Sequence, residues 1–354
     1  MMVPILAVLT ALIIGGIVIA AVGGNPFYAY LGLFQGAFGS AKAWSETAVW
    51  ASPYIFAGLA VALAFKGGLF NIGAEGQLAL GAVVAAWIGY ALPDILGVSL
   101  PAIVHLPLAV GLGILAGALW GAIPGALKAY TGGHEVINTI MMNYIALNMV
   151  SFLLNGPMKD KTPGNVIART PEIAESARIA PIFEGFRVHW GFVLALVAAA
   201  VVWWLLWKTT LGFEIRTVGS NPDAGKYAGI NVKRIITLTM ALSGLLAGMA
   251  GAIEVSGLNY RHELGFSVGY GFDAIAIALL GKTHPVGVVL AALLFAGMRN
   301  GATRMQFLTQ IPVDIISVIQ ALILLFVAAD AIIRYIYRIR AREERLVLTR
   351  GWGG

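Results

Sequence analysis

Gly281-Lys282-Thr283 is the string most suggestive of catalysis, because a phosphate-binding P-loop ends in residues of these types and order. A P-loop also requires a glycine five residues before Gly281, and that position holds Ala276. Apolar residues lie on both sides of the string, whereas a P-loop joins a soluble strand to a helix. We therefore expect a turn between two membrane spans here, and no nucleotide site within this chain.

Other catalytic arrangements are absent from the sequence. The chain has no cysteine, which excludes a disulfide framework, a thiolate metal site and a cysteine nucleophile. No two histidines are four residues apart, and all five fall at expected span ends or in loops: His105, His134, His189, His262 and His284. We therefore expect no catalytic residue, no metal site and no cofactor, which makes a membrane enzyme the weakest functional alternative.

Three carboxylates lie inside apolar runs, where an ionised side chain is costly enough to indicate function. They are Glu75, Glu254 and Asp273. Two roles remain open for Glu75. Asn71 can cap a helix whose positive end attracts the carboxylate, or the carboxylate can lie on a transport path.

Amide side chains accompany these carboxylates at Gln77, Asn138, Asn143 and Asn148. Amides suit an uncharged polar solute, and they suit hydrogen bonds between helices equally well. Both interpretations stay open. The residues predicted as candidates for a translocation path are Asn71, Glu75, Gln77, Asn138, Asn143, Glu254 and Asp273.

Composition places the whole chain in a lipid bilayer. Of its residues, 59% are hydrophobic and 11% are charged, and the mean hydropathy is +0.85. A soluble domain carries roughly 25% charged residues. Long apolar runs recur from end to end, each near the roughly 20 residues that cross a bilayer. We attribute the net charge of +6 to membrane topology and expect no nucleic-acid partner.

Apolar runs mark eight candidate spans, near 4–22, 47–65, 72–92, 106–127, 136–155, 191–207, 235–256 and 312–333. The segment 264–303 contains a charged break and Pro285, which favours two further spans joined by a tight turn. Basic residues are retained on the cytoplasmic side, and they concentrate in 208–234 and 334–354. An even number of crossings must separate these segments, so the sequence predicts ten spans with both termini cytoplasmic.

This topology divides the chain into a transmembrane domain over 1–333 and a basic cytoplasmic tail over 334–354. Within the domain, 208–234 lies inside and the loop 156–190 lies outside. The first run, 4–22, has no basic region before it, so we expect a membrane span rather than a secretory signal.

Glycines recur every four residues in one span, at Gly113, Gly117, Gly121 and Gly125. This spacing lines one helical face with small residues, against which another helix can pack closely. We expect packing within the chain, with a dimer interface as the alternative.

A short helix is predicted in the middle of the cytoplasmic segment 208–234. Asn221 can cap its amides, Pro222 suits its first position, Asp223 favours its positive end and Gly229 can end it. Such a helix can dock a partner, and the alternative is a helix that lies on lipid headgroups. The candidate docking residues are Asn221, Pro222, Asp223, Lys226, Tyr227 and Gly229.

Four stretches carry a resemblance to a known family: GLFNIGAEGQLALGA (68–82), HEVINTIMMNYIALNMVSFLLNGPMKD (134–160), VGSNPDAGKYAGINVKR (218–234) and GYGFDAIAIALLGKTHPVGVVLAALLFAGMRNG (269–301). They resemble the inner-membrane permeases of the branched-chain amino acid and simple-sugar ABC importers. Within that family they look most like permeases of nucleoside uptake systems. The resemblance extends from about residue 25 to residue 329.

The resemblance implies an all-α, type II-like ABC importer permease in the bacterial inner membrane, with 1–333 as its permease domain. It implies three partners, namely a cytoplasmic ABC ATPase that binds the ATP, an extracytoplasmic substrate-binding lipoprotein, and a second permease subunit encoded as a different chain. It makes 221–229 the coupling helix that docks in the ATPase. The expected substrate is a nucleoside, purine nucleosides first, with a simple sugar such as ribose as the alternative.

A secondary transporter or channel that acts alone is the rival from another functional class. It differs from an importer subunit in needing neither an ATPase nor a receptor.

Overall fold

The computed structural model describes residues 2–267, 269–329, 332–333 and 336–338, and these residues are predominantly helical. Short π-helical turns, Leu127–Thr131 and Val255–Asn259, extend α5 and α10. The α-helices are α1 Met2–Ala21, α2 Pro26–Phe38, α3 Ala41–Lys66, α4 Ala74–Leu96, α5 Ala102–Ala126, α6 Glu135–Asn155, α7 Trp190–Lys208, α8 Thr210–Ser220, α9 Pro222–Tyr227, α10 Val232–Glu254, α11 Tyr270–Leu280, α12 Pro285–Thr309 and α13 Asp314–Ala328.

Among the described residues, 8 helices are long and apolar enough to cross a bilayer. They are α1, α3, α4, α5, α6, α7, α10 and α12, and two shorter apolar helices are α11 and α13. The all-α membrane fold expected from composition is therefore confirmed. The count of ten crossings and the side on which the termini lie stay predictions. The tail predicted over 334–354 falls outside the described residues except for 336–338.

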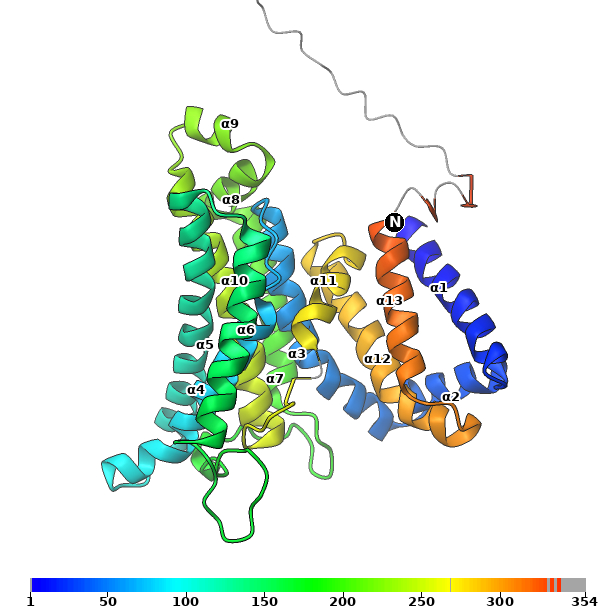
Figure 1. Ribbon diagram of the computed structural model, residues 1–354, viewed down its shortest axis with the longest axis horizontal. Coiled ribbons are helices and arrows are strands. Elements are labelled where there is room, and N and C mark those ends of the chain that lie inside the picture. Colours follow the sequence, from blue (N-terminus) through cyan, green and yellow to red (C-terminus); the bar gives the residue numbers. More distant parts are fainter. Residues whose placement is uncertain (1, 268, 330–331, 334–335, 339–354) are drawn as a thin grey trace, which may run out of the picture.

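The helices run between two ends of the molecule (Figure 1). One end carries α8 and α9, and the start of α1 and the end of α13 lie toward it. The long loop before α7 projects from the opposite end. The even number of crossings between 208–234 and 334–354 stays a prediction.

The segment 264–303 differs from the prediction of two complete spans. Pro285 does begin a new helix, after a turn in which Lys282 and Thr283 have φ of 52° and 53°. However, α11 has 11 residues, so it rises only about 16 Å, roughly half of the hydrocarbon thickness. Residues 260–267, which lie before it, are not helical.

A helix that was not predicted, α2, lies between α1 and α3. Its 13 residues are too few to cross a bilayer, which is why a search for long apolar runs misses it. Asn25 caps it by accepting a hydrogen bond from the Phe27 amide at 2.9 Å. Gly301 of α12 meets α2 so closely that a Cβ at this position would overlap the Leu33 carbonyl oxygen.

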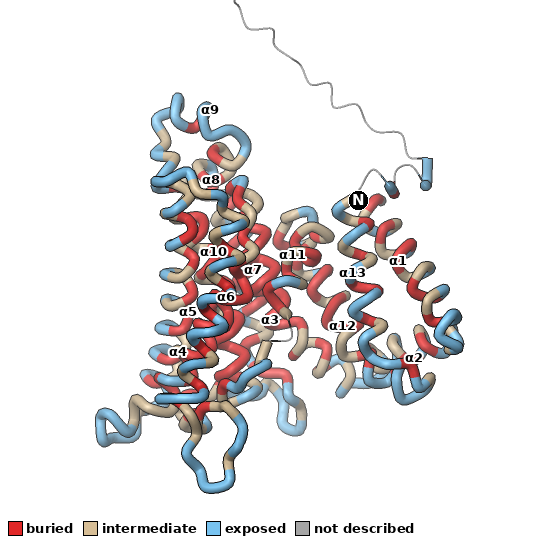
Figure 2. Tube along the Cα trace, viewed as in Figure 1, coloured by how far each residue is buried: buried red, intermediate tan, exposed pale blue. Residues whose placement is uncertain are grey.

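Two helices at the centre organise the packing. α3 is the most buried of the membrane helices and packs against α7, α10, α11 and α12. The closest pairing is between α5 and α10. Buried positions concentrate along α3 and α10, whereas exposed positions dominate the outward faces of α5 and α6 (Figure 2).

Glycines form the contact between α5 and α10. The four spaced glycines of α5, Gly113, Gly117, Gly121 and Gly125, are all buried. A Cβ on Gly117 would lie 2.5 Å from the Gly244 carbonyl oxygen, and one on Gly121 would lie 2.6 Å from the Met240 carbonyl oxygen. In this chain the glycine face therefore packs against another helix of the same chain.

Gly117→Ala is expected to destabilise the protein, because the added methyl group forces two backbones apart. The cost of such overpacking is about 1–3 kcal/mol. The measurement is thermal unfolding of the purified protein in detergent. Gly111→Ala is the matched control on the same helix, since a Cβ there meets nothing within 4 Å. Equal unfolding temperatures for the two variants would contradict the packing role of Gly117.

Candidate functional site

Three of the predicted path residues, Asn71, Gln77 and Asn143, are buried and hydrogen-bonded to protein groups. The Asn71 amide nitrogen donates to Gln77 Oε1 at 2.9 Å and to Ser243 Oγ at 2.8 Å. The prediction that Asn71 caps α4 is wrong, because the cap position is Gly73, whose amide donates to Asn71 Oδ1 at 2.9 Å. Asn71 instead ties the chain before α4 to α10.

Asn143 of α6 completes this arrangement. Its Oδ1 accepts from the Gly76 amide at 2.8 Å, and its amide nitrogen donates to the Ile72 carbonyl oxygen at 2.8 Å. The backbone of 71–76 is therefore satisfied by side chains of neighbouring helices, as buried backbone requires. Asn138 lies one turn into α6, apart from these contacts, and its amide nitrogen has no hydrogen-bond partner among the described residues.

Glu75 joins α4 to the half-length helix α11. Its Oε2 accepts a hydrogen bond from the Gly271 amide at 2.7 Å, and the residue is 4% exposed. A carboxylate at this position satisfies one of the unpaired amides at the start of α11 and faces the positive end of its dipole. Gly271 has no room for a side chain, since a Cβ would overlap the Glu75 backbone nitrogen.

Aromatic side chains surround Asp273 in the first turn of α11. Tyr54 of α3 donates its hydroxyl to Asp273 Oδ2 at 2.8 Å, and its ring centroid lies 5.0 Å from that of Tyr270. The Trp50 and Tyr270 centroids are 6.2 Å apart. Tyr270 also reaches Glu254 Oε1 at 3.5 Å. Two of the predicted carboxylates, Asp273 and Glu254, thus belong to one cluster between α3, α10 and α11.

Arg299 of α12 is the residue that sequence reasoning missed. Its guanidinium lies 5.7 Å from the Trp50 ring centroid and near enough to Tyr54 and Asp273 to interact with them electrostatically. Arg299 follows the apolar first half of α12, and this helix continues to Thr309. The signal that could have identified Arg299 is that polar residues continue the apolar run at helical spacing, which indicates that the same helix goes on.

A cavity of about 780 Å³ lies between α2, the start of α3 and the second half of α12. Its polar lining includes Gln35, Lys42, Glu46, Asn300, Thr303 and Arg304. The Asn300 amide nitrogen lies 3.0 Å from each of three acceptors, the carbonyl oxygens of Gly36 and Ala43 and the Thr47 hydroxyl. Asn300 therefore fixes α12 to the turn between α2 and α3.

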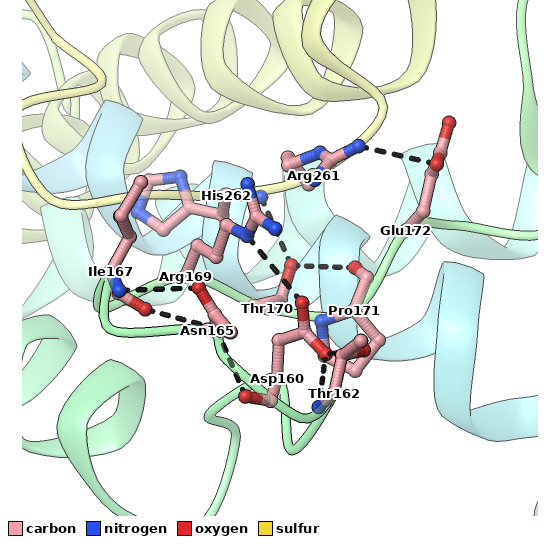
Figure 3. A network of polar contacts seen from close by, with 10 residues as sticks. All are labelled: Asp160, Thr162, Asn165, Ile167, Arg169, Thr170, Pro171, Glu172, Arg261 and His262. Atoms are coloured by element: carbon pink, nitrogen blue, oxygen red, sulfur yellow. Dashed lines mark hydrogen bonds and ion pairs between the residues drawn. The ribbon is translucent and has the colours of Figure 1, made fainter.

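The loop 156–189 is fastened to the connector between α10 and α11 (Figure 3). The Thr170 amide donates to the His262 carbonyl oxygen at 2.8 Å, and the His262 amide donates to Thr170 Oγ1 at 3.0 Å. Glu172 pairs with both Arg178 and Arg261, at 3.1 and 3.2 Å. Burial lowers the pKa of His262 to about 3, so this imidazole is neutral at pH 7. The loop 156–189 and the connector after α10 are therefore joined by both backbone and side-chain contacts.

The predicted short helix is present as α9. Asn221 Oδ1 accepts from the amides of Asp223 and Ala224 at 2.9 and 3.1 Å, and Pro222 is the first helical residue. Gly229 follows the helix with φ of 81°. Tyr227 is 97% exposed, and Asp223 and Lys226 are exposed beside it. In Figure 1, α9 lies at the extreme end of the molecule, where another protein can reach it.

A backbone contact connects α8 to the chain between α3 and α4. A Cβ on Gly219 would overlap the Lys66 carbonyl oxygen, and one on Gly68 would lie 2.7 Å from the Gly219 carbonyl oxygen. Gly68 also has φ of 70°, which favours glycine. The connection 67–73 leads to Asn71 and Glu75, so a continuous set of contacts extends from α8 to the start of α11.

Comparison with known proteins gives a consistent result. The family described as "Branched-chain amino acid transport system / permease component" matches residues 43–328. The chain is 42% identical to the Guanosine ABC transporter permease protein NupP of Bacillus subtilis, over 95% of both chains. It is 38% identical to the Nucleoside ABC transporter permease protein NupB of Lactococcus lactis, over 94% of this chain and 92% of that one.

A third relative carries a different substrate in its name. The chain is 37% identical to the Glucose ABC transporter permease protein TsgB13 of Haloferax volcanii, over 97% of this chain and 90% of that one. No solved structure matches the chain.

Proposed function

The chain belongs to the family of branched-chain amino acid transport system permease components, and from this premise we propose that it is the membrane-spanning permease subunit of an ABC importer for nucleosides. It is a multi-pass protein of the inner membrane, as its eight long apolar helices and its relatives indicate. The observation that carries the substrate class is near full-length identity of 42% and 38% to permeases named for guanosine and nucleosides.

We assign ATP hydrolysis to a separate ABC ATPase and solute delivery to an extracytoplasmic receptor, with a second permease chain that completes the pathway. The sequence Gly281-Lys282-Thr283 supports this division of labour. Its residues form the turn between α11 and α12, and His284 precedes Pro285 at the start of α12. A P-loop instead joins a strand to a helix.

The exposed helix α9 is the proposed docking element for the ATPase. Closure of the ATPase pulls α9 and α8, and the contact of Gly219 with 66–68 transfers this movement to the start of α4. Glu75 then moves the α11 half-helix to which it is bonded. Transport results because the outward-open and inward-open states of the pathway bind the solute with different affinity.

A comparison of guanosine uptake with ribose and glucose uptake tests the substrate class. Membrane vesicles that contain the assembled importer are expected to accumulate labelled guanosine when ATP is supplied, and excess ribose or glucose is expected not to compete. A sugar is the second candidate because of the 37% identity to a glucose permease. Accumulation of ribose or glucose in place of guanosine would replace the nucleoside assignment with a sugar.

A further inference from the structure

Arg299 places a charge inside a membrane-spanning helix, where a charged side chain is costly and indicates a function. It lies 14 residues into α12, about 21 Å from the start of this helix and so within the hydrocarbon region. Arg299 is half-buried. None of the ion pairs among the described residues includes it. Charged side chains within membrane spans face a pathway or bind a ligand far more often than they face lipid.

Asp273 presents a complementary group on the facing helix. Tyr54 occupies its Oδ2, while Oδ1 has no hydrogen-bond partner among the described residues. Trp50 lies beside Arg299, and all three side chains, Trp50, Asp273 and Arg299, are partly exposed. An acceptor, a guanidinium and an indole thus belong to one partly exposed cluster between α3, α11 and α12.

The cavity lies next to this cluster along α12, because Asn300 and Thr303 line it. Thr303 lines the cavity and lies one helical turn from Arg299 on the same side of α12. The cavity volume of about 780 Å³ is within the range of sites that hold small organic ligands. Arg299 does not line the cavity, but it directly precedes Asn300, which does.

The chemistry of the three groups fits a nucleoside with an oxygen at position 6 of a purine. A guanidinium donates two parallel hydrogen bonds to the O6 and N7 acceptors of guanine, and adenine instead presents a donor at position 6. A carboxylate oxygen accepts from sugar hydroxyls, and an indole stacks on a base. Resting on the proposed function, we propose that Arg299, Asp273 and Trp50 form an intramembrane binding site for 6-oxopurine nucleosides such as guanosine and inosine.

Arg299→Lys tests the site, because lysine keeps the charge and loses the paired donors. ATP-driven uptake of labelled guanosine, adenosine and uridine is measured for the assembled importer with its receptor. Dividing each rate by the wild-type rate removes the contribution of the receptor. Guanosine uptake is expected to fall at least about fivefold more than adenosine or uridine uptake. Arg304→Lys, in the cavity lining of the same helix, is the matched control and is expected to leave these ratios unchanged.

Photolabelling of the wild-type importer with 8-azidoguanosine tests the site without any substitution, so the misfolding of a variant cannot affect the result. The label is expected on peptides of α3, α11 or α12. Equal losses for all nucleosides in Arg299→Lys, or a label confined to other helices, would overturn the site and leave the nucleoside importer intact. A wild-type importer that takes up no nucleoside would overturn the proposed function and the site together.

Discussion

Replacing Gly219 with alanine is expected to reduce ATP-driven nucleoside uptake by roughly tenfold or more, while the ATPase still binds. Gly219 lies near the end of α8, just before the cap of α9. Its backbone touches the carbonyl oxygen of Lys66, and no space remains for a methyl group. Alanine therefore separates α8 from the chain before α4 without altering the exposed face of α9.

The measurement combines uptake with co-purification of the ATPase. Gly225→Ala is the matched control in α9 itself, because its Cβ would lie 3.3 Å from the Val218 side chain and no closer than 3.8 Å to any backbone atom. We expect near wild-type uptake for this control. Full uptake by Gly219→Ala would show that the α8 contact transmits nothing. Loss of ATPase binding would show that the contact supports docking rather than transmission.

Glu75→Ala is expected to give the second large effect, a loss of uptake of about tenfold. The change leaves the Gly271 amide buried without an acceptor, at a cost of about 1–3 kcal/mol, and removes the carboxylate from the positive end of α11. Because α11 is only 11 residues long, its first turn depends strongly on the hydrogen bond from the Gly271 amide to Glu75.

Glu75→Gln separates the hydrogen bond from the charge. Glutamine keeps an acceptor oxygen at nearly the same position, so its uptake is expected to lie between those of wild type and Glu75→Ala. Both variants are compared for uptake and for receptor-stimulated ATPase activity in the assembled importer. Equal uptake by wild type and Glu75→Ala would contradict a role for this contact in positioning α11.

Local features of the fold could be predicted from the sequence because they depend on neighbouring residues. The cap of α9 depends on Asn221 and two amides within three positions, and Pro222 fixes the next backbone angle. The break before α12 depends on Pro285 in the same way. Composition was sufficient for the membrane assignment, because the bilayer acts on every span alike.

Features that depend on distant partners could not be predicted. Asn71 bonds to Ser243, 172 residues away, and this contact, rather than a helix cap, fixes its role. Glu75 similarly bonds to a backbone amide 196 residues away. The half-length of α11 has a related cause, since residues 261–267 before it form a non-helical connector that is bonded to the loop 156–189.

The roles of the candidate path residues could not be predicted from the sequence either. Asn71 and Gln77 bond to each other, and Asn143 bonds to the backbone of Ile72 and Gly76, so all three make hydrogen bonds within the protein in this conformation. Hydropathy alone cannot separate such amides from those that contact solute. Arg299 went unnoticed for the opposite reason, because it follows an apolar run and looks like the end of a span.

Reconstitution of the purified chain into liposomes is the most direct test of its assignment as an importer subunit. Uptake of labelled guanosine is measured with the chain alone, and then with the second permease, the ATPase, the receptor and ATP added. We predict uptake only from the complete set, with none when the ATPase or the receptor is omitted. Guanosine transport by the chain alone, with neither ATPase nor receptor, would contradict the assignment and identify a secondary transporter or a channel.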